Sequence, residues 1–447
     1  MKKALKYIFL LGLLALAYAV YTNYPRLNII AGYSAKDMAS SVFLAERSVE
    51  FTDSVDNGFT PINIADDKVD LQEKSATASV YGLLTRKAIY REGLGAVLVP
   101  KDADENQTFL IPKRNFTDNG KPFPYGDAEQ KDTVFENINY NLLQTAVDSM
   151  FNNNKLKQTR SVLVVYKDEI VAEKYAEGFD ENSKLLGWSM TKSITSTIFG
   201  ILQKQGKLNI NDKAPIESWK DDERASITIN NLLQMNSGLA WEEDYEKISD
   251  VTKMLFLTDD MTKIQEEKGL IGKPNEVWNY SSGTSNLLSG ILRKQFSTHQ
   301  EYLDFWYSAL IDKIGMHSMV IEADMKGNYV GSSYGWATTR DWAKFGLLYL
   351  HKGNWNGEQL FEESWSDYVK TPTNGSNGQY GGHFWLNAGG KYPDAPKDLY
   401  SANGYQGQRV FIIPSKDLVI VRMGLTNNDN AFDFNTFLKE ILSSIKN

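Results

Sequence analysis

Apolar positions after residue 132 follow helix and strand spacings in turn. Between 138 and 150 they recur every four residues, which predicts an amphipathic helix. Residues 161–166 and 170–175 are rich in Val, Ile and Tyr and flank a polar run at 167–169, which predicts an antiparallel hairpin. The main part of the chain is therefore expected to open with a helix and a hairpin.

The same two patterns occur in reverse order towards the C-terminus. Residues 409–413 and 418–423 predict a second hairpin, and the amphipathic run 432–445 predicts a closing helix. A further helix is predicted to begin near Ser189 and to end at Gly206, which acts as a C-terminal cap. We expect an α/β fold, in which an antiparallel sheet is flanked by terminal helices and a helical half lies between the two hairpins.

The N-terminus has the pattern of a targeting segment. Three lysines precede an apolar run at 7–20, which is shorter than the roughly 20 residues of a comfortable membrane span and fits a signal peptide. Ala17-Tyr18-Ala19 offers a small-x-small cleavage site, although the residues up to Tyr24 also allow an uncleaved anchor. In both cases the lysines stay in the cytoplasm. The rest of the chain is then exported, into the periplasm or onto the outer face of the inner membrane.

Residues 1–24 form this targeting segment, and the remainder divides in two. Residues 25–131 contain short Val-, Tyr- and Thr-rich runs at 75–82 and 87–100, which predict a small β-rich accessory segment. The Gly- and Pro-containing stretch 118–132 is the predicted linker, and the main domain is expected at 132–447.

Composition narrows the chemistry of the chain. Its 447 residues carry a formal net charge of -8 without a basic cluster, which argues against nucleic acid as a partner. The chain has no cysteine and four histidines, none in a metal-ligand spacing, so we expect no disulfide, no metal site and no cofactor. The expected partner is a small-molecule substrate, with the membrane contacted only through an uncleaved N-terminal segment.

Ser189-Met190-Thr191-Lys192 is the strongest candidate for a reactive centre. A serine hydroxyl is a weak nucleophile at neutral pH and needs a base within hydrogen-bond reach. Residues three apart on a helix share one face, so Lys192 can reach Ser189. Apolar surroundings lower the pKa of a lysine, which favours a neutral base. The motif alone is not specific, because Ser443 and Lys446 repeat it by accident.

Two later motifs supply partners for such a serine. Tyr280-Ser281-Ser282 places a phenol before an apolar run, and a phenol near a lysine can carry protons between nucleophile, base and leaving group. Gly404-Tyr405-Gln406-Gly407-Gln408 stands just before a predicted strand, where a free amide can polarise a substrate carbonyl. Taken singly, the first motif also fits an ordinary core aromatic and the second a tight turn.

The order S-x-x-K, a capped helix at 228–239 with the pattern L-L-x-x-x-S-G-L, Y-S-S and G-x-x-G-Q resembles the serine β-lactamase and penicillin-binding family. The pattern is most similar to class C-like enzymes and 6-aminohexanoate-dimer hydrolases, over about residues 132–447. This resemblance implies a β-lactamase/transpeptidase-like fold and hydrolysis of small amides or esters through an acyl-serine. It implies that Ser189 is the nucleophile, Lys192 the base and Tyr280 the proton shuttle. The backbone amides of Ser189 and Gln408 would form the oxyanion hole.

Departures from the family pattern bear on the substrate. Ser282 stands where β-lactamases often have asparagine, and Tyr405 stands where the Lys-Thr-Gly strand motif has its lysine. The carboxylate of a penicillin then lacks its anchor, so β-lactamase or D-alanyl peptidase activity is the alternative rather than the expectation. We expect Ser282, Tyr405 and Gly407 to contact substrate, together with Tyr245, which lies where related amidohydrolases have a mobile loop.

Two other interpretations of the sequence compete with this one. Gly331-Ser332-Ser333-Tyr334-Gly335 matches the G-x-S-x-G nucleophile elbow of α/β-hydrolases. The segment before it is a poor strand and the later histidines have no suggestive context, so a glycine-rich turn is the better interpretation. A protein of the same fold can also bind ligand or become acylated without turnover, as a sensor. The retained serine, lysine and tyrosine favour turnover.

Overall fold

The computed structural model describes residues 2–100, 103, 107–116, 120–126, 128, 130, 133–428 and 431–446. Asp118 and Asp132, the two ends of the predicted linker, lie outside the described residues. The chain forms two compact units. Unit 1 comprises Met1–Tyr90, Ala96–Gln107 and Glu242–Asp259, and unit 2 comprises Arg91–Gly95, Thr108–Trp241 and Asp260–Asn447.

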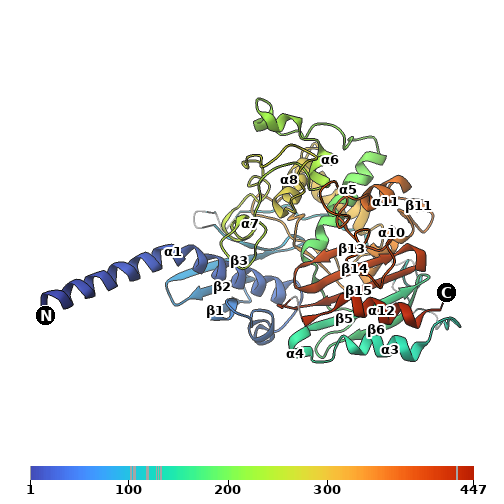
Figure 1. The fold of residues 1–447 in the computed structure, drawn as a ribbon, viewed down its shortest axis with the longest axis horizontal. Coiled ribbons are helices and arrows are strands. Elements are labelled where there is room, and N and C mark those ends of the chain that lie inside the picture. Colours follow the sequence, from blue (N-terminus) through green and yellow to red (C-terminus); the bar gives the residue numbers. More distant parts are fainter. Residues whose placement is uncertain are drawn as a thin grey trace. The chain divides into compact units, whose positions relative to one another are not determined.

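A single long helix, α1 (Lys2–Phe43), opens unit 1 (Figure 1). It continues well beyond the predicted apolar run at 7–20, and its second half is buried from Ile30 onwards. This buried half packs against β1 (Ala65–Asp70), β2 (Ser75–Val80) and α7 (Asp250–Leu257). The sequence alone does not show this extension, because the small residues that let the helix approach the sheet are not strongly apolar.

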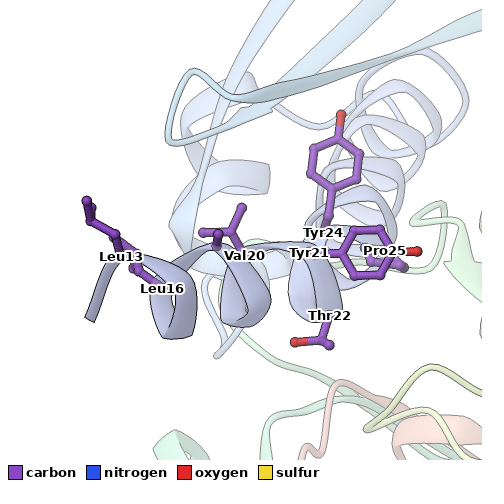
Figure 2. A pocket seen from close by; sticks show the side chains of 8 residues that line it. Leu13, Leu16, Val20, Tyr21, Thr22, Tyr24 and Pro25 are labelled. Carbon is purple, nitrogen blue, oxygen red and sulfur yellow. The ribbon is translucent and has the colours of Figure 1, made fainter. Parts of the chain in front are cut away.

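The first half of α1 is exposed. Residues 4–26 are all exposed, and an 18-residue window in this half has a mean hydropathy of 1.8 and no buried residue. This is the one helix among the described residues that is long and apolar enough to cross a membrane. Figure 2 shows an open hollow along it, bordered by leucine, tyrosine and Pro25 side chains.

A four-stranded sheet accompanies α1 in the order β1-β2-β3-β4, with β3 at Leu84–Arg91 and β4 at Gly95–Leu98. Antiparallel pairing links β1 to β2, with Asp70 opposite Ser75, and β2 to β3, with Val80 opposite Leu84. Strands therefore occupy both runs for which the sequence predicts them, and a small β-rich N-terminal segment is confirmed.

Unit 2 is built on a six-stranded antiparallel sheet in the order β12-β13-β14-β15-β5-β6. The first predicted hairpin is β5 (Thr159–Tyr166) with β6 (Glu169–Tyr175), and the second is β14 (Gln408–Ile413) with β15 (Leu418–Gly424). Because β15 pairs with β5, the two hairpins meet in the sheet. The strands β13 (Tyr400–Gly404) and β12 (Trp385–Leu386) extend it beyond β14.

Helices cover both faces of this sheet, so every residue of β5 and β15 is buried (Figure 1). On one face α3 (Tyr140–Ser149) packs against α12 (Phe434–Ser444), and their apolar side chains join Val162 and Val164 in one cluster. On the other face α10 (Thr339–Leu350) packs on β5, β14 and β15, with Leu163 and Val165 in a larger cluster. Alternate residues of β5 thus serve different cores.

The larger cluster extends into a helical half. It is formed by α5 (Thr191–Lys204), α6 (Ile229–Leu233), α8 (Ser282–Arg293), α9 (His299–Trp306) and α11 (Glu363–Lys370). Helix α8 packs against α5, α6 and α9, which makes it the centre of this half. An antiparallel sheet with terminal helices and a helical half is the predicted fold class, which is therefore confirmed.

The remaining elements are short. In unit 1 they are α2 (Val49–Phe51), η1 (Thr52–Asp56) and η2 (Ile62–Ile64). In unit 2 they are α4 (Asn154–Lys157), β7 (Leu185–Leu186), η3 (Trp188–Met190), η4 (Glu217–Trp219), η5 (Glu223–Ser226), η6 (Tyr307–Ile311), β8 (Val320–Ile321), β9 (Gly335–Ala337), β10 (Asn354–Trp355), β11 (Glu358–Gln359), η7 (Tyr405–Gly407) and η8 (Pro414–Lys416).

Candidate functional site

Ser189 lies in the 3-10 turn η3, which runs directly into α5. The backbone of Trp188 has a φ of +47°, a left-handed conformation that is strained for a bulky residue. Two hydrogen bonds hold it, from Trp188 Nε1 to Gln406 Oε1 at 3.1 Å and from Thr191 Oγ1 to the Trp188 carbonyl at 2.8 Å. Trp188 and Met190 are buried and Ser189 is half-buried, so the serine is the residue of this turn that keeps some access to solvent.

Lys192 is only 1% exposed. Its Nζ donates to Ser189 Oγ, to Ser282 Oγ and to the Ser332 carbonyl, each at 2.9 Å. A carbonyl oxygen only accepts, so one N–H of Lys192 points to Ser332, whereas the two hydroxyls can each donate or accept. The S-x-x-K pair is therefore in direct contact. A neutral Lys192 in this place could take the proton of Ser189.

The Tyr280-Ser281-Ser282 motif lies at the start of α8, where Ser281 caps the helix by accepting the Thr284 N–H at 2.9 Å. Ser282 is fully buried and touches Lys192 through its hydroxyl. Tyr280 is half-buried, and Lys192 Nζ lies 4.9 Å from the centre of its ring. Two residues of the motif thus reach the lysine, one with a hydroxyl and the other with a ring face.

The segment Gly331–Gly335, which matches the nucleophile-elbow pattern, forms a wall beside α5. Besides the Ser332 carbonyl, it offers the Gly331 carbonyl to Thr195 Oγ1 at 2.8 Å and the Gly335 N–H to Thr191 Oγ1 at 2.9 Å. All five of its residues are buried, and the strand β9 begins at Gly335. An elbow nucleophile needs an exposed position and a following helix, and Ser333 has neither.

Gly404–Gln408 forms the tight connection between β13 and β14, whose last pair is Gly404 opposite Gln408. A Cβ on Gly404 would lie 2.1 Å from the Gly187 carbonyl, so only glycine allows this approach to the Ser189 turn. The Tyr405 ring packs edge-on against Trp188 at 5.7 Å, with an interplanar angle of 88°. The two segments predicted to supply the oxyanion amides therefore lie against each other.

Arg422 supports this connection from within the sheet and is fully buried. It donates to the Gln406 carbonyl at 3.2 Å and to the Gly407 carbonyl at 3.1 Å, and also to Thr159 and Thr426. Burial, with further contributions from Arg409 and Arg160, lowers the pKa of Arg422 to about 9. A buried guanidinium is thus committed to holding backbone carbonyls in place.

His383 joins three helices of the helical half. One ring nitrogen, Nδ1, lies 2.6 Å from the Leu233 carbonyl, and the other, Nε2, lies 2.9 Å from Ser285 Oγ. Its own carbonyl accepts from Ser193 Oγ at 2.8 Å. Burial, assisted by the charge of Lys192, lowers the pKa of His383 to about 3. The imidazole is therefore uncharged at neutral pH, with Nδ1 donating to Leu233.

Two further predictions concern Tyr245 and metal ligands. Tyr245 belongs to the Glu242–Asp259 part of unit 1, where its hydroxyl lies 3.4 Å from Glu243 Oε1. Its approach to Ser189 stays a prediction. Among the described residues no group of three or more His, Asp or Glu side chains could hold a metal ion.

Three contacts of the site were not predicted from the sequence. For the Ser332 carbonyl a signal existed, because a glycine-rich pentapeptide with two serines stands out in the sequence. His383 and Arg422 gave no signal, since a histidine or an arginine in a loop or a strand looks the same whether it is exposed or buried.

Comparison with known proteins gives a consistent result. The β-lactamase family model matches residues 155–439, more than half of the chain. A Bacillus anthracis structure named for 6-aminohexanoate-dimer hydrolase has a TM-score of 0.54 at 21% identity, over 67% of this chain and 79% of that one. A Bacteroides dorei structure named as a β-lactamase has 0.56 at 14%, over 69% and 99%. A family VIII carboxylesterase has 0.53 at 14%, over 68% and 96%. At these identities the structures share the fold.

Proposed function

Because the chain belongs to the β-lactamase family, we propose that it is an exported serine hydrolase that cleaves small amides or esters through an acyl-Ser189 intermediate. The observation that carries the proposal is the 2.9 Å contact between Lys192 Nζ and Ser189 Oγ. Burial disfavours the charged form of a lysine, and a neutral amine is what a serine nucleophile needs as its base.

In the acylation step Ser189 Oγ attacks the substrate carbonyl carbon while neutral Lys192 takes the hydroxyl proton. One N–H of Lys192 remains on the Ser332 carbonyl and one on Ser282, which leaves its lone pair for Ser189. The bond to the leaving group then breaks, and the proton passes from Lys192 through Tyr280 to the leaving atom. Water repeats the sequence on the acyl-enzyme and releases the acid.

The negative charge on the carbonyl oxygen needs two backbone donors. The amides of Ser189 and Gln408 are the proposed pair, since amides at the start of a helix lack intrahelical partners. The close approach of Gly404 to Gly187 makes the neighbouring Tyr405 amide the alternative to Gln408. Losing one such donor typically lowers turnover on the order of a hundredfold or more.

Substrate contacts are proposed for Tyr405, Gly407 and Tyr245. Tyr405 and Gly407 are half-buried in the connection that packs on the Ser189 turn. Ser282, which is fully buried and touches Lys192, is the fourth proposed contact.

The unbroken α1 supports a retained membrane anchor over a cleaved leader. The helix passes through the candidate cleavage site at Ala17–Ala19 and continues into the buried part of unit 1. With the lysines in the cytoplasm, both units would lie on the outer side of the membrane.

The decisive experiment measures the intact mass of the full chain in lipid nanodiscs after incubation with activated esters, simple amides and penicillins. Ser189→Ala serves as the matched control. A mass gain or product release that requires Ser189 is the expected result. Turnover of penicillins alone would favour the β-lactamase or peptidase alternative, and a stoichiometric adduct that never hydrolyses would favour a sensor. A folded protein that reacts with no donor contradicts the proposal.

A further inference from the structure

Four aromatic side chains pack together next to Lys192. Tyr380 lies at their centre, with its ring 5.6 Å from Trp278, 5.7 Å from Tyr280 and 5.2 Å from Trp385. Tyr280 and Trp385 are also in contact at 5.3 Å, and Trp278 and Trp385 at 6.3 Å. We call these four residues the aromatic cluster. Three of the five pairs are edge-to-face, a geometry that is favourable beyond the buried area, so the rings form a well-packed surface.

The exposure of the cluster differs from that of the core aromatics. Tyr380 is 1% exposed, whereas Trp278, Tyr280 and Trp385 are each half-buried. The large core tryptophans of unit 2, such as Trp306 and Trp342, are fully buried. Three rings of the cluster are therefore partly accessible to solvent. The fourth, Tyr380, is buried and packs against all three.

The cluster adjoins the reacting groups through Tyr280. Lys192 Nζ contacts Ser189 Oγ at 2.9 Å and lies 4.9 Å from the centre of the Tyr280 ring. Tyr280 is also the residue through which the leaving atom is proposed to receive its proton. A leaving group next to Tyr280 would also be near Trp385, whose ring centre lies 5.3 Å from that of Tyr280, and Trp278 is in turn 6.3 Å from Trp385.

Charge at the cluster disfavours a cationic leaving group. Lys391 Nζ lies 5.6 Å from the centre of the Trp385 ring, and Lys192 lies over Tyr280. The Trp385 face thus already carries a cation, and Lys192 becomes a second one when it takes the Ser189 proton. An uncharged ring or a bulky hydrocarbon can pack on the remaining faces without like-charge repulsion.

We propose that the aromatic cluster binds the leaving group of the substrate, and that this group is an uncharged aryl or bulky apolar alcohol or amine. The inference rests on the proposed serine hydrolase function. It names the substrate class as acyl esters or amides of aromatic or bulky apolar alcohols and amines. It adds Trp278 and Trp385 to the substrate-contacting residues, with the buried Tyr380 as their support.

The test compares benzyl acetate with methyl acetate on the full chain in nanodiscs. The two esters share an acyl group and have leaving alcohols of similar acidity, so their kcat/KM ratio reports leaving-group binding. The wild type should prefer the benzyl ester at least about tenfold, which corresponds to about 1.4 kcal/mol. Trp385→Ala and Trp278→Ala should lower this ratio about tenfold, whereas Trp385→Phe should largely keep it. Phe116→Ala, which removes an exposed aromatic elsewhere in unit 2, is the matched control and should leave the ratio unchanged.

A ratio that both tryptophan variants leave unchanged would overturn the inference, as would a preference for acetylcholine, whose leaving group is cationic. Binding provides a readout that does not need turnover. Benzyl alcohol should bind Ser189→Ala in a ligand-detected NMR titration, and the added Trp385→Ala change should weaken this binding about tenfold. If the wild type hydrolyses neither ester, the titration still decides the inference, and the proposed function is decided separately by the mass experiment with the full set of donors.

Discussion

At the scale of single residues, Lys192 combines near-complete burial with three oxygen neighbours. We predict that Lys192→Ala lowers kcat/KM for a simple ester by about a hundredfold to ten-thousandfold, the usual contribution of a positioned base. Lys204→Ala changes an exposed lysine at the other end of α5 and should have wild-type activity. Circular dichroism and thermal unfolding check that both variants fold. Wild-type turnover in Lys192→Ala would refute the assignment of the base.

Ser282 tests how the lysine is held. Its hydroxyl accepts an N–H of Lys192, and a hydrogen bond to the charged form of a group favours that form. We predict that Ser282→Ala moves the acid limb of the kcat/KM profile to lower pH, because the charged form of the base loses an acceptor. The maximal rate should fall about tenfold. A purely structural loss would lower the rate without moving the limb.

A matched control for Ser282 lies two turns along the same helix. Ser289 is also fully buried, but its hydroxyl contacts Tyr302 and the Tyr329 carbonyl rather than Lys192. Ser289→Ala should therefore leave the pH limb in place. If both variants shift the limb equally, Ser282 has no special relation to the base.

Sequence separation explains which contacts of the site could be predicted. Contacts between residues close together in the chain were predictable, and those between distant residues were not. Ser189 and Lys192 are three residues apart on a helix, so their contact follows from local geometry. The contact between Lys192 and Ser332 spans 140 residues, and that between His383 and Leu233 spans 150. Such contacts depend on the packing of whole elements, which no local pattern encodes.

At the scale of elements, His383 holds α5, α6 and α8 through three hydrogen bonds. The folded protein keeps its imidazole uncharged down to about pH 3, whereas an unfolded histidine takes up a proton near pH 6.5. Unfolding between these pH values therefore binds a proton, and stability falls as the pH drops from 6.5 towards 3. The slope for one proton is about 1.4 kcal/mol per pH unit.

We predict that His383→Asn removes this part of the acid sensitivity. Asparagine tolerates the left-handed backbone at this position, where φ is +65°, and its amide can replace the bond to Leu233. Urea unfolding at pH 7 and pH 5 gives the comparison, and the variant should lose less stability between them than the wild type. Between pH 7 and pH 8 the imidazole is mostly uncharged in both states, so the difference between the two proteins should change little. An equal loss on acidification would contradict the prediction.

Elements with a regular pattern were predictable, and those set by tertiary contact were not. Both hairpins of unit 2 and its two terminal helices follow from alternation and four-residue spacing. The two-residue strands β7 and β8 pair only with β9 and are too short to leave a pattern. The second half of α1 is helical because it packs on β1 and β2, which its weakly apolar sequence does not reveal.

At the scale of the whole molecule, Glu242–Asp259 is the segment whose unit is hardest to predict from the sequence. It lies between residues of unit 2 in the chain yet belongs to unit 1, where α7 packs against α1. No change in amino-acid composition marks the ends of a segment that packs with a different unit from its neighbours in the chain. The chain divides into these two units, and the predicted domain boundary at residue 131 stays a prediction.

The N-terminal half of α1 determines whether the whole protein stays attached to the membrane. Residues 5–24 form about 30 Å of helix, the thickness of a bilayer core, and they are exposed throughout. Tyr18, Tyr21 and Tyr24 lie where an anchor has its interfacial aromatic residues. We therefore predict that the protein keeps Met1 or Lys2 at its N-terminus and stays in the membrane fraction after extraction with alkaline carbonate. The intact mass and N-terminal sequencing measure the first point, and the carbonate extraction measures the second.

A variant at the candidate cleavage site distinguishes a cleaved signal peptide from a retained anchor. Signal peptidases require a small residue before the cut, so Ala19→Leu would block cleavage and raise the mass of a processed protein by that of its leader. For a retained anchor the mass should change only by the substitution itself, and both forms should stay in the membrane. A wild-type protein that begins at Val20 and is released by carbonate would show that α1 is cut in two. Residues 20–43 would then be left as an ordinary helix of unit 1.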